Sequence, residues 1–223
     1  MNAVIGESLL SAVGIALSPL PLIAVILMLR SPHGKRTSAM FLLGWLVGIL
    51  VAIVAFTALS SIIPASDPAA SRRIFGAIAI VLGAVLILLA AGELRGRTST
   101  SENTELPRWL APIDSLSPGR AGAFGFVLAV ARPKNLLLAI VGGATIGAVQ
   151  LEFWQLAVCV AIFVVVASAT VWIPIIAFLA APARLAVVLE SLHQWLVRHN
   201  SVIVAAVLTI VGVVLIGAGI AGF

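Results

Sequence analysis

The segment Ala131-Arg132-Pro133-Lys134-Asn135 places two cations and a proline inside an apolar stretch that runs from Ala121 to Val149. A charge at the centre of a bilayer costs about 3 kcal/mol, so such residues are first interpreted as parts of a functional site. If the membrane helix began after the cations, at Leu136, it would be clearly shorter than the roughly 20 residues that a span needs. The whole stretch is in turn too long for one straight span. We therefore predict a broken or re-entrant helix, with its break at Pro133, rather than a cytoplasmic loop followed by a short helix.

The composition predicts an all-α integral membrane protein. Hydrophobic residues make up 62% of the 223 residues and charged residues only 9%, which is too apolar for a soluble core. Several apolar runs are long enough for a membrane helix, and the alternating pattern of a membrane barrel is not present. The net charge of +5 comes from loop residues. Cytoplasmic loops are commonly basic, so no nucleic-acid partner is predicted.

Six transmembrane helices are predicted, over residues 3–29, 38–62, 74–92, 121–149, 154–179 and 202–220. The first contains Ser18-Pro19-Leu20-Pro21, and it must kink or unwind there because two prolines remove two backbone donors. The fifth is expected to be distorted at Trp172-Ile173-Pro174. In residues 183–199, apolar side chains recur at helical spacing with polar ones between them, which predicts a helix lying in the membrane interface. The alternative is that this stretch extends the fifth helix.

The chain is predicted to consist of two three-helix halves. Residues 1–93 form the first half, residues 94–120 a polar cytoplasmic linker, and residues 121–223 the second half with the interfacial helix. Nine loop cations fall on the linker side of the membrane and only Arg72 and Arg73 on the other. The positive-inside rule therefore predicts a multi-pass protein of the plasma membrane with both termini outside.

The first helix of each half carries the same pattern, a polar residue and a proline followed by an aliphatic run. With three spans in each half, the second copy enters the membrane in the opposite sense, which is the inverted repeat of secondary transporters. Pro19 lies as far along the chain from Ala3 as Pro133 lies from Val149. Ala3 and Val149 are both at the predicted outer surface, so the breaks in helices 1 and 4 are expected to lie at one depth and to meet.

The residues at these two breaks are the predicted substrate-binding site: Ser18, Pro19, Pro21, Arg132, Pro133, Lys134 and Asn135. Arg132 offers a planar fork for a phosphate or sulfate group, Lys134 adds a second positive charge, and Asn135 offers neutral hydrogen bonds. Helix N-termini created at the breaks add partial positive charge. The site is therefore predicted to bind an anion.

No catalytic site, metal site or cofactor is predicted. The histidines fall in loops or in the interfacial helix, without acidic neighbours at metal-ligand spacing: His33, His193 and His199. Cys159 is the only cysteine, so neither a disulfide nor a redox pair is possible within the chain. The acidic residues that border the predicted spans lie at helix ends, which disfavours a cation exporter: Glu7, Glu93 and Glu152.

Three stretches resemble the GAP/Sap family of actinobacteria, the peptidoglycolipid- and sulfolipid-addressing proteins: residues 18–29, Gly44-Trp45-x-x-Gly48 and residues 132–138. The similarity covers nearly the whole chain and is most specific at 132–138. That family is placed in the LysE exporter superfamily, whose members have about six helices in two halves, and it is associated with delivering glycolipids to the cell surface. The resemblance implies export or lipid translocation, and it leaves the substrate open.

Three functions remain open. The first is translocation of an anionic lipid or glycolipid toward the cell surface, with its headgroup between the breaks at 18–21 and 132–135. The second is export of a small polar solute such as an amino acid, and the third is a non-transporting subunit that recruits lipid-synthesis machinery of the cell envelope. Gly44-x-x-x-Gly48 and Gly143-x-x-x-Gly147 permit close helix packing within one chain or between two. The superfamily resemblance favours a homodimer.

Overall fold

The computed structural model describes residues 2–31, 33–61, 68–99, 116–149, 151–180 and 182–220, and in these ranges every regular element is a helix. The prediction of an all-α protein is confirmed. In chain order the helices are α1 (Asn2–Ala16), α2 (Pro19–Arg30), α3 (Gly34–Ser61), α4 (Pro68–Ser99), α5 (Pro118–Val130), α6 (Pro133–Gly147), α7 (Phe153–Ala167), α8 (Ala169–Ala180) and α9 (Pro182–Ile220).

Two straight segments are long and apolar enough to cross a membrane: Gly34–Ser60 in α3 and Gly76–Arg95 in α4. Three consecutive helix pairs are each bent at a short break, by 54° between α1 and α2, 66° between α5 and α6, and 65° between α7 and α8. If each bent pair is one span, the described residues contain up to five spans. The apolar part of α9, Ser201–Gly217, is shorter than these.

The first two breaks follow from prolines that begin a helix. Pro19 is the first residue of α2 and Pro133 the first residue of α6. A residue before proline is driven out of the α region, and both Ser18 (φ −112°, ψ 109°) and Arg132 (φ −83°, ψ 123°) are extended. Each proline then suits the start of the next helix, where its missing N–H costs nothing. The predicted breaks at 18–21 and at Pro133 are confirmed.

The third break lies upstream of its predicted position. The helix was expected to distort at 172–174, but it ends at Ala167 and resumes at Ala169, and Pro174 lies inside α8. A proline lacks the N–H that the carbonyl four residues earlier needs, and its ring crowds the preceding turn. The bend itself lies at Ser168, whose N–H closes the last turn of α7 by donating to the Val164 carbonyl at 3.1 Å.

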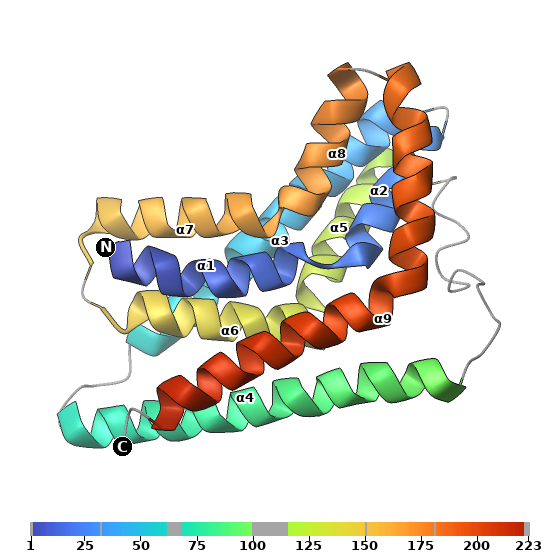
Figure 1. Ribbon diagram of the computed structural model, residues 1–223. Helices are drawn as coiled ribbons and strands as arrows, with labels where there is room; N and C mark the ends of the chain where they lie inside the picture. Colours follow the sequence, from blue (N-terminus) through green and yellow to red (C-terminus); the bar gives the residue numbers. More distant parts are fainter. Residues whose placement is uncertain are drawn as a thin grey trace.

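The C-terminal part of the chain forms one helix where two were predicted. Residues 183–199, predicted as a separate interfacial helix, and residues 202–220, predicted as the sixth helix, both belong to α9. Figure 1 shows this helix bent near its middle, so that one part lies beside α8 and the other along α4. Its location in a membrane interface stays a prediction. Of the predicted linker, residues 94–99 belong to α4 and 118–120 to α5, and residues 100–115 lie outside the described ranges.

The two Gly-x-x-x-Gly motifs lie in contacts between helices of the same chain. A Cβ on Gly44 would collide with the Gly122 carbonyl oxygen, and one on Gly48 would lie 2.8 Å from the Ala129 Cβ, so α3 and α5 touch through their backbones. A Cβ on Gly143 would lie 2.6 Å from the Phe56 Cβ, which brings α6 equally close to α3. The predicted homodimer therefore requires a different surface.

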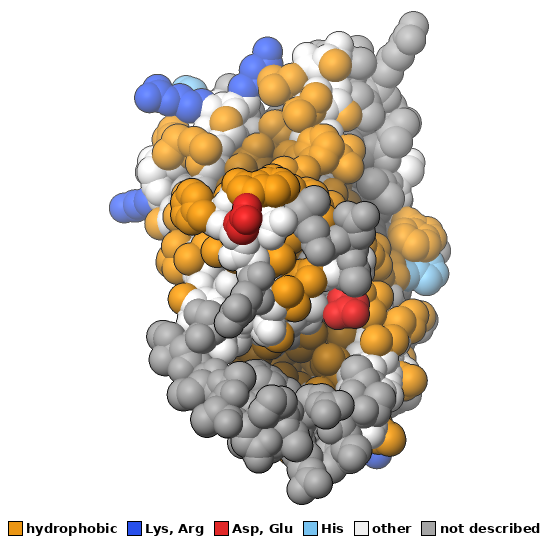
Figure 2. Space-filling view, turned by 90° about the vertical axis from the view of Figure 1, so that its left-hand side faces the viewer, with side chains coloured by type: hydrophobic (Ala, Val, Ile, Leu, Met, Phe, Trp, Pro, Cys, Tyr) orange, Lys and Arg blue, Asp and Glu red, His pale blue; other side chains and the backbone are white. Residues whose placement is uncertain are grey.

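Much of the remaining surface is apolar. Large hydrophobic side chains such as Leu88 and Phe153 are 71% and 86% exposed. Figure 2 looks onto one end of the molecule, where hydrophobic side chains cover much of the described surface and acidic groups are few. Such a surface is stable in contact with lipid and not with water.

Candidate functional site

The two proline breaks lie in direct contact. Arg132 Nη1 donates a hydrogen bond to Ser18 Oγ at 2.9 Å, although the two residues are far apart in the chain. Lys134 Nζ donates to the Leu17 carbonyl oxygen at 3.1 Å. The breaks in the first helix of each predicted half therefore meet, as expected from their equal distances to Ala3 and Val149, the predicted outer ends of the two helices.

The backbone groups that these contacts satisfy are ones that the prolines leave free. In a continuous helix the N–H of residue 21 would donate to the carbonyl of residue 17, but Pro21 has no N–H. Lys134 Nζ donates to that carbonyl instead. Pro133 leaves the Ala129 carbonyl free by the same rule, and Asn135 Nδ2 donates to it at 3.3 Å. In an apolar medium each unpaired carbonyl would be costly, so these side chains maintain the broken geometry.

The polar groups at the breaks are removed from the surface. The exposed fraction is 6% for Lys134, 1% for Asn135 and 1% for Ser18, and Arg132 is half-buried. Asn135 Oδ1 is buried without a hydrogen-bond partner. Burying a cation is unfavourable unless an anion or several acceptors compensate it. The site therefore favours a negatively charged group beside Arg132 and Lys134.

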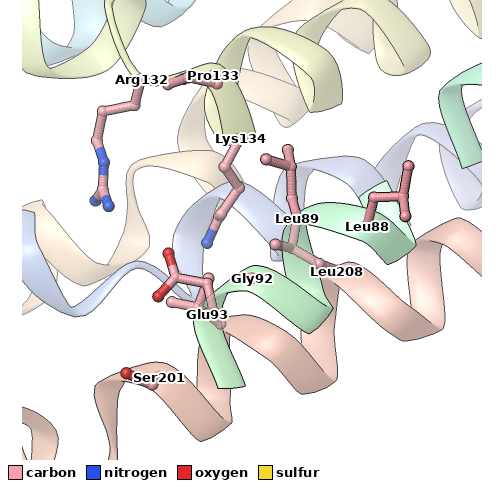
Figure 3. Close-up of a pocket in the computed structure, with 10 residues that line it drawn as sticks. Leu88, Leu89, Gly92, Glu93, Arg132, Pro133, Lys134, Ser201 and Leu208 are labelled. Carbon is pink, nitrogen blue, oxygen red and sulfur yellow. The ribbon is translucent and has the colours of Figure 1, made fainter. Parts of the chain in front are cut away.

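A cavity of about 490 Å³ adjoins these cations. Its described lining residues come from α4, from the break before α6 and from α9: Leu88, Leu89, Gly92, Glu93, Arg132, Pro133, Lys134, Ser201, Val204 and Leu208. Figure 3 shows Arg132 and Lys134 extending from the break toward α4, with leucines of α4 and α9 beside them. Leu88 is 71% exposed, so the cavity reaches the apolar outer face of α4. The side of the cavity formed by Arg132 and Lys134 is cationic. The opposite side is mostly apolar, with Glu93 and Ser201 as its polar residues.

Glu93 is a residue of the site that was not predicted from the sequence. The predicted third helix ended at Gly92, which left Glu93 at a helix end, but α4 continues to Ser99. Glu93 lines the cavity, and in Figure 3 its carboxylate points toward Lys134 from the opposite wall. It attracts both Arg132 and Lys134 electrostatically. The available signal was that residues 93–99 contain no proline, so the helix had no reason to end at Gly92.

The predicted site residues thus fall into two groups. Arg132, Pro133 and Lys134 line the cavity. Ser18 and Asn135 are not among its described lining residues: Ser18 holds Arg132, and Asn135 holds the Ala129 carbonyl. Pro19 begins α2, and Pro21 frees the carbonyl that binds Lys134.

Among the described residues, no group of three or more His, Cys, Asp or Glu side chains could hold a metal ion, and Cys159 is buried.

Pro133 leaves the Ala129 carbonyl free and Asn135 donates to it. This predicts that the effects of mutating Asn135 and Pro133 on stability are coupled. Asn135→Leu leaves the Ala129 carbonyl unpaired, at a cost of about 1–3 kcal/mol of stability, partly offset because the unpaired Oδ1 is removed as well. In a Pro133→Ala background the restored N–H can reach the same carbonyl. The loss caused by Asn135→Leu is then expected to be about 1 kcal/mol smaller. Unfolding of the four proteins of this double-mutant cycle in detergent measures the coupling, and equal losses in both backgrounds would contradict it.

Comparison with known proteins identifies one protein family. The family model described as Sap, sulfolipid-1-addressing protein, matches residues 9–221, so the match includes both breaks and all described residues that line the cavity. No curated protein and no solved structure matches the chain.

Proposed function

The chain belongs to the Sap (sulfolipid-1-addressing protein) family, and we propose that it translocates an anionic lipid or glycolipid. The lipid moves across the plasma membrane toward the cell surface. The family description supports a role in lipid addressing or export.

The observation that carries the proposal is the division of this cavity into a cationic side and an apolar side. Arg132 and Lys134 form the cationic side. The other side is formed mainly by leucine and valine side chains of α4 and α9, with the Glu93 carboxylate among them. A lipid has the same division, a charged headgroup joined to apolar chains. A small polar solute would leave the apolar wall without a matching partner, and a purely structural subunit would have no use for a cationic cavity.

The cations retain donors for a headgroup. A guanidinium has five N–H groups and an ammonium three. One donor of Arg132 is used by Ser18 and one of Lys134 by the Leu17 carbonyl. The first turn of α6 adds the partial positive charge of a helix N-terminus and contains no acidic residue. A sulfate or phosphate oxygen placed there would accept several charge-assisted hydrogen bonds.

We also propose that the two halves are inverted repeats that move against each other, with α9 as a sixth span. The packing supports this: α3 of the first half lies against α5 and α6, and α7 and α8 of the second half lie against α1 and α2. Exchanging the halves therefore reproduces the same neighbour pattern. Figure 1 shows α4 and α9, the last helices of the two halves, packed along each other. Rocking between such halves is how inverted-repeat transporters alternate access.

Lipid retention tests the proposed function. Native mass spectrometry of the protein extracted from membranes that contain zwitterionic and anionic lipids is expected to find anionic species enriched on the protein. Bound lipids present in the same proportions as in the membrane would contradict an anion-selective site. The Arg132 and Lys134 variants described in the Discussion provide the matched comparison.

The proposed orientation has an independent test. With Cys159 replaced by alanine, single cysteines are introduced at positions 67 and 100, which lie in the stretches predicted outside and inside. A membrane-impermeant maleimide added to intact cells is expected to label position 67 only, and to label position 100 after permeabilisation. The reverse pattern would place both termini in the cytoplasm.

A further inference from the structure

We propose that Glu93 selects the charge of the headgroup, restricting the cavity to lipids that carry one negative charge. This inference rests on the proposed function and goes beyond it, because it assigns a specificity-determining residue and a substrate class. Sulfate monoesters and phosphodiesters carry one negative charge, whereas a phosphate monoester carries about 1.5 to 2 at neutral pH.

Three charged side chains are among the described residues that line the cavity. Arg132 and Lys134 contribute two positive charges, and Glu93 on the opposite wall contributes one negative charge. The described lining residues of α9 are uncharged: Ser201, Val204 and Leu208. With both cations protonated, the described lining residues therefore carry a formal charge of +1.

Burial makes this charge selective. Lys134 is only 6% exposed and Arg132 and Glu93 are half-buried, so water screens the charges weakly. A singly charged headgroup between the cations neutralises the cavity. A doubly charged headgroup would leave one negative charge uncompensated and would lie near the Glu93 carboxylate, which Figure 3 shows directed at the same ammonium. Unpaired buried charge and repulsion between like charges both disfavour this complex.

The alternative role for Glu93 is purely structural, holding Lys134 in place. A structural role affects the stability of the protein or the affinity for every anionic lipid alike. If Glu93 selects by charge, its removal changes the ratio in which two anionic lipids are retained. The test therefore measures that ratio.

The experiment is a lipid competition on the full-length protein in nanodiscs that contain phosphatidylglycerol and phosphatidic acid in equal parts, in phosphatidylcholine. Native mass spectrometry after release from the nanodisc gives the ratio of the two anionic lipids retained. At about pH 7 phosphatidic acid, a phosphate monoester, carries about 1.5 to 2 negative charges, whereas phosphatidylglycerol carries one. Wild type is expected to retain phosphatidylglycerol preferentially. Glu93→Gln is expected to shift the ratio toward phosphatidic acid by about tenfold or more, as expected for removal of a nearby charge in a poorly screened site.

Control variants separate charge from other effects. Glu7→Gln removes an exposed carboxylate of α1 that does not line the cavity, and it is expected to keep the wild-type ratio. Glu93→Asp retains the charge and is expected to keep the preference for phosphatidylglycerol. Glu93→Ala makes the same charge change as Glu93→Gln and replaces it if the glutamine variant does not fold.

An unchanged ratio in the uncharged variants would overturn the role of Glu93. Retention of phosphatidylglycerol that still depends on Arg132 and Lys134 would leave the proposed function standing in that case. If wild type retains neither anionic lipid above phosphatidylcholine, the proposed function fails and the role of Glu93 fails with it.

Discussion

Arg132→Ala and Lys134→Ala are each expected to reduce retention of anionic lipid by about ten- to a hundredfold. A hydrogen bond to a charged group contributes about 1.5–3 kcal/mol, and about 1.4 kcal/mol corresponds to a factor of ten in affinity. Both side chains line the cavity. Lys134 is almost completely buried and Arg132 is half-buried, so water weakens the interaction of Lys134 less than that of Arg132. The ratio of anionic to zwitterionic lipid on the purified protein measures the effect.

Folding must be monitored in the same proteins, because Lys134 also satisfies the Leu17 carbonyl. Lys134→Ala is therefore expected to lower the unfolding temperature as well, whereas Lys134→Arg keeps a charged donor and tests whether charge is enough. Lys35→Ala removes an exposed cation at the start of α3 and serves as the control. Normal lipid selectivity in both Arg132→Ala and Lys134→Ala would show that the cavity does not bind the headgroup.

Gly44→Ala is expected to cause the largest loss of stability. The added methyl group would overlap the carbonyl oxygen of Gly122, and a backbone carbonyl cannot rotate away as a side chain can. The α3 and α5 helices must therefore separate, which exposes the contacts on both sides of the glycine. We expect a loss of at least about 3 kcal/mol, the upper part of the usual range for overpacking. The measurement is the unfolding midpoint in detergent and the yield of monodisperse protein.

Gly6→Ala is the matched control for this substitution. Gly6 also lies inside a helix, but a Cβ added there meets nothing within 4 Å. Alanine is the better helix former, so stability is expected to stay equal or to rise slightly. Equal stability of Gly44→Ala and Gly6→Ala would mean that α3 and α5 are not packed backbone to backbone.

The sequence alone determined the features that depend on near neighbours in the chain. Apolar composition and run length determined the membrane class and the helices. Proline acts on the residue before it and on the carbonyl four residues earlier, so the breaks at Ser18 and Arg132 were predictable from the local sequence. The same local rule was less accurate at Pro174, because a proline inside a helix limits the bend to the preceding turns without selecting the residue at which it occurs.

The tertiary structure decided which groups meet. The partners of Arg132 and Lys134 lie in the distant N-terminal part of the chain, at the first break, and Glu93 enters the cavity because α4 continues to Ser99 and packs along α9. The glycine motifs fit either an internal or an intermolecular contact by sequence, and the close approach of α3 to α5 and α6 assigns them to the interior. Local rules act within about one helical turn, whereas these contacts depend on how whole helices pack, and that packing is set jointly by side chains far apart in the chain.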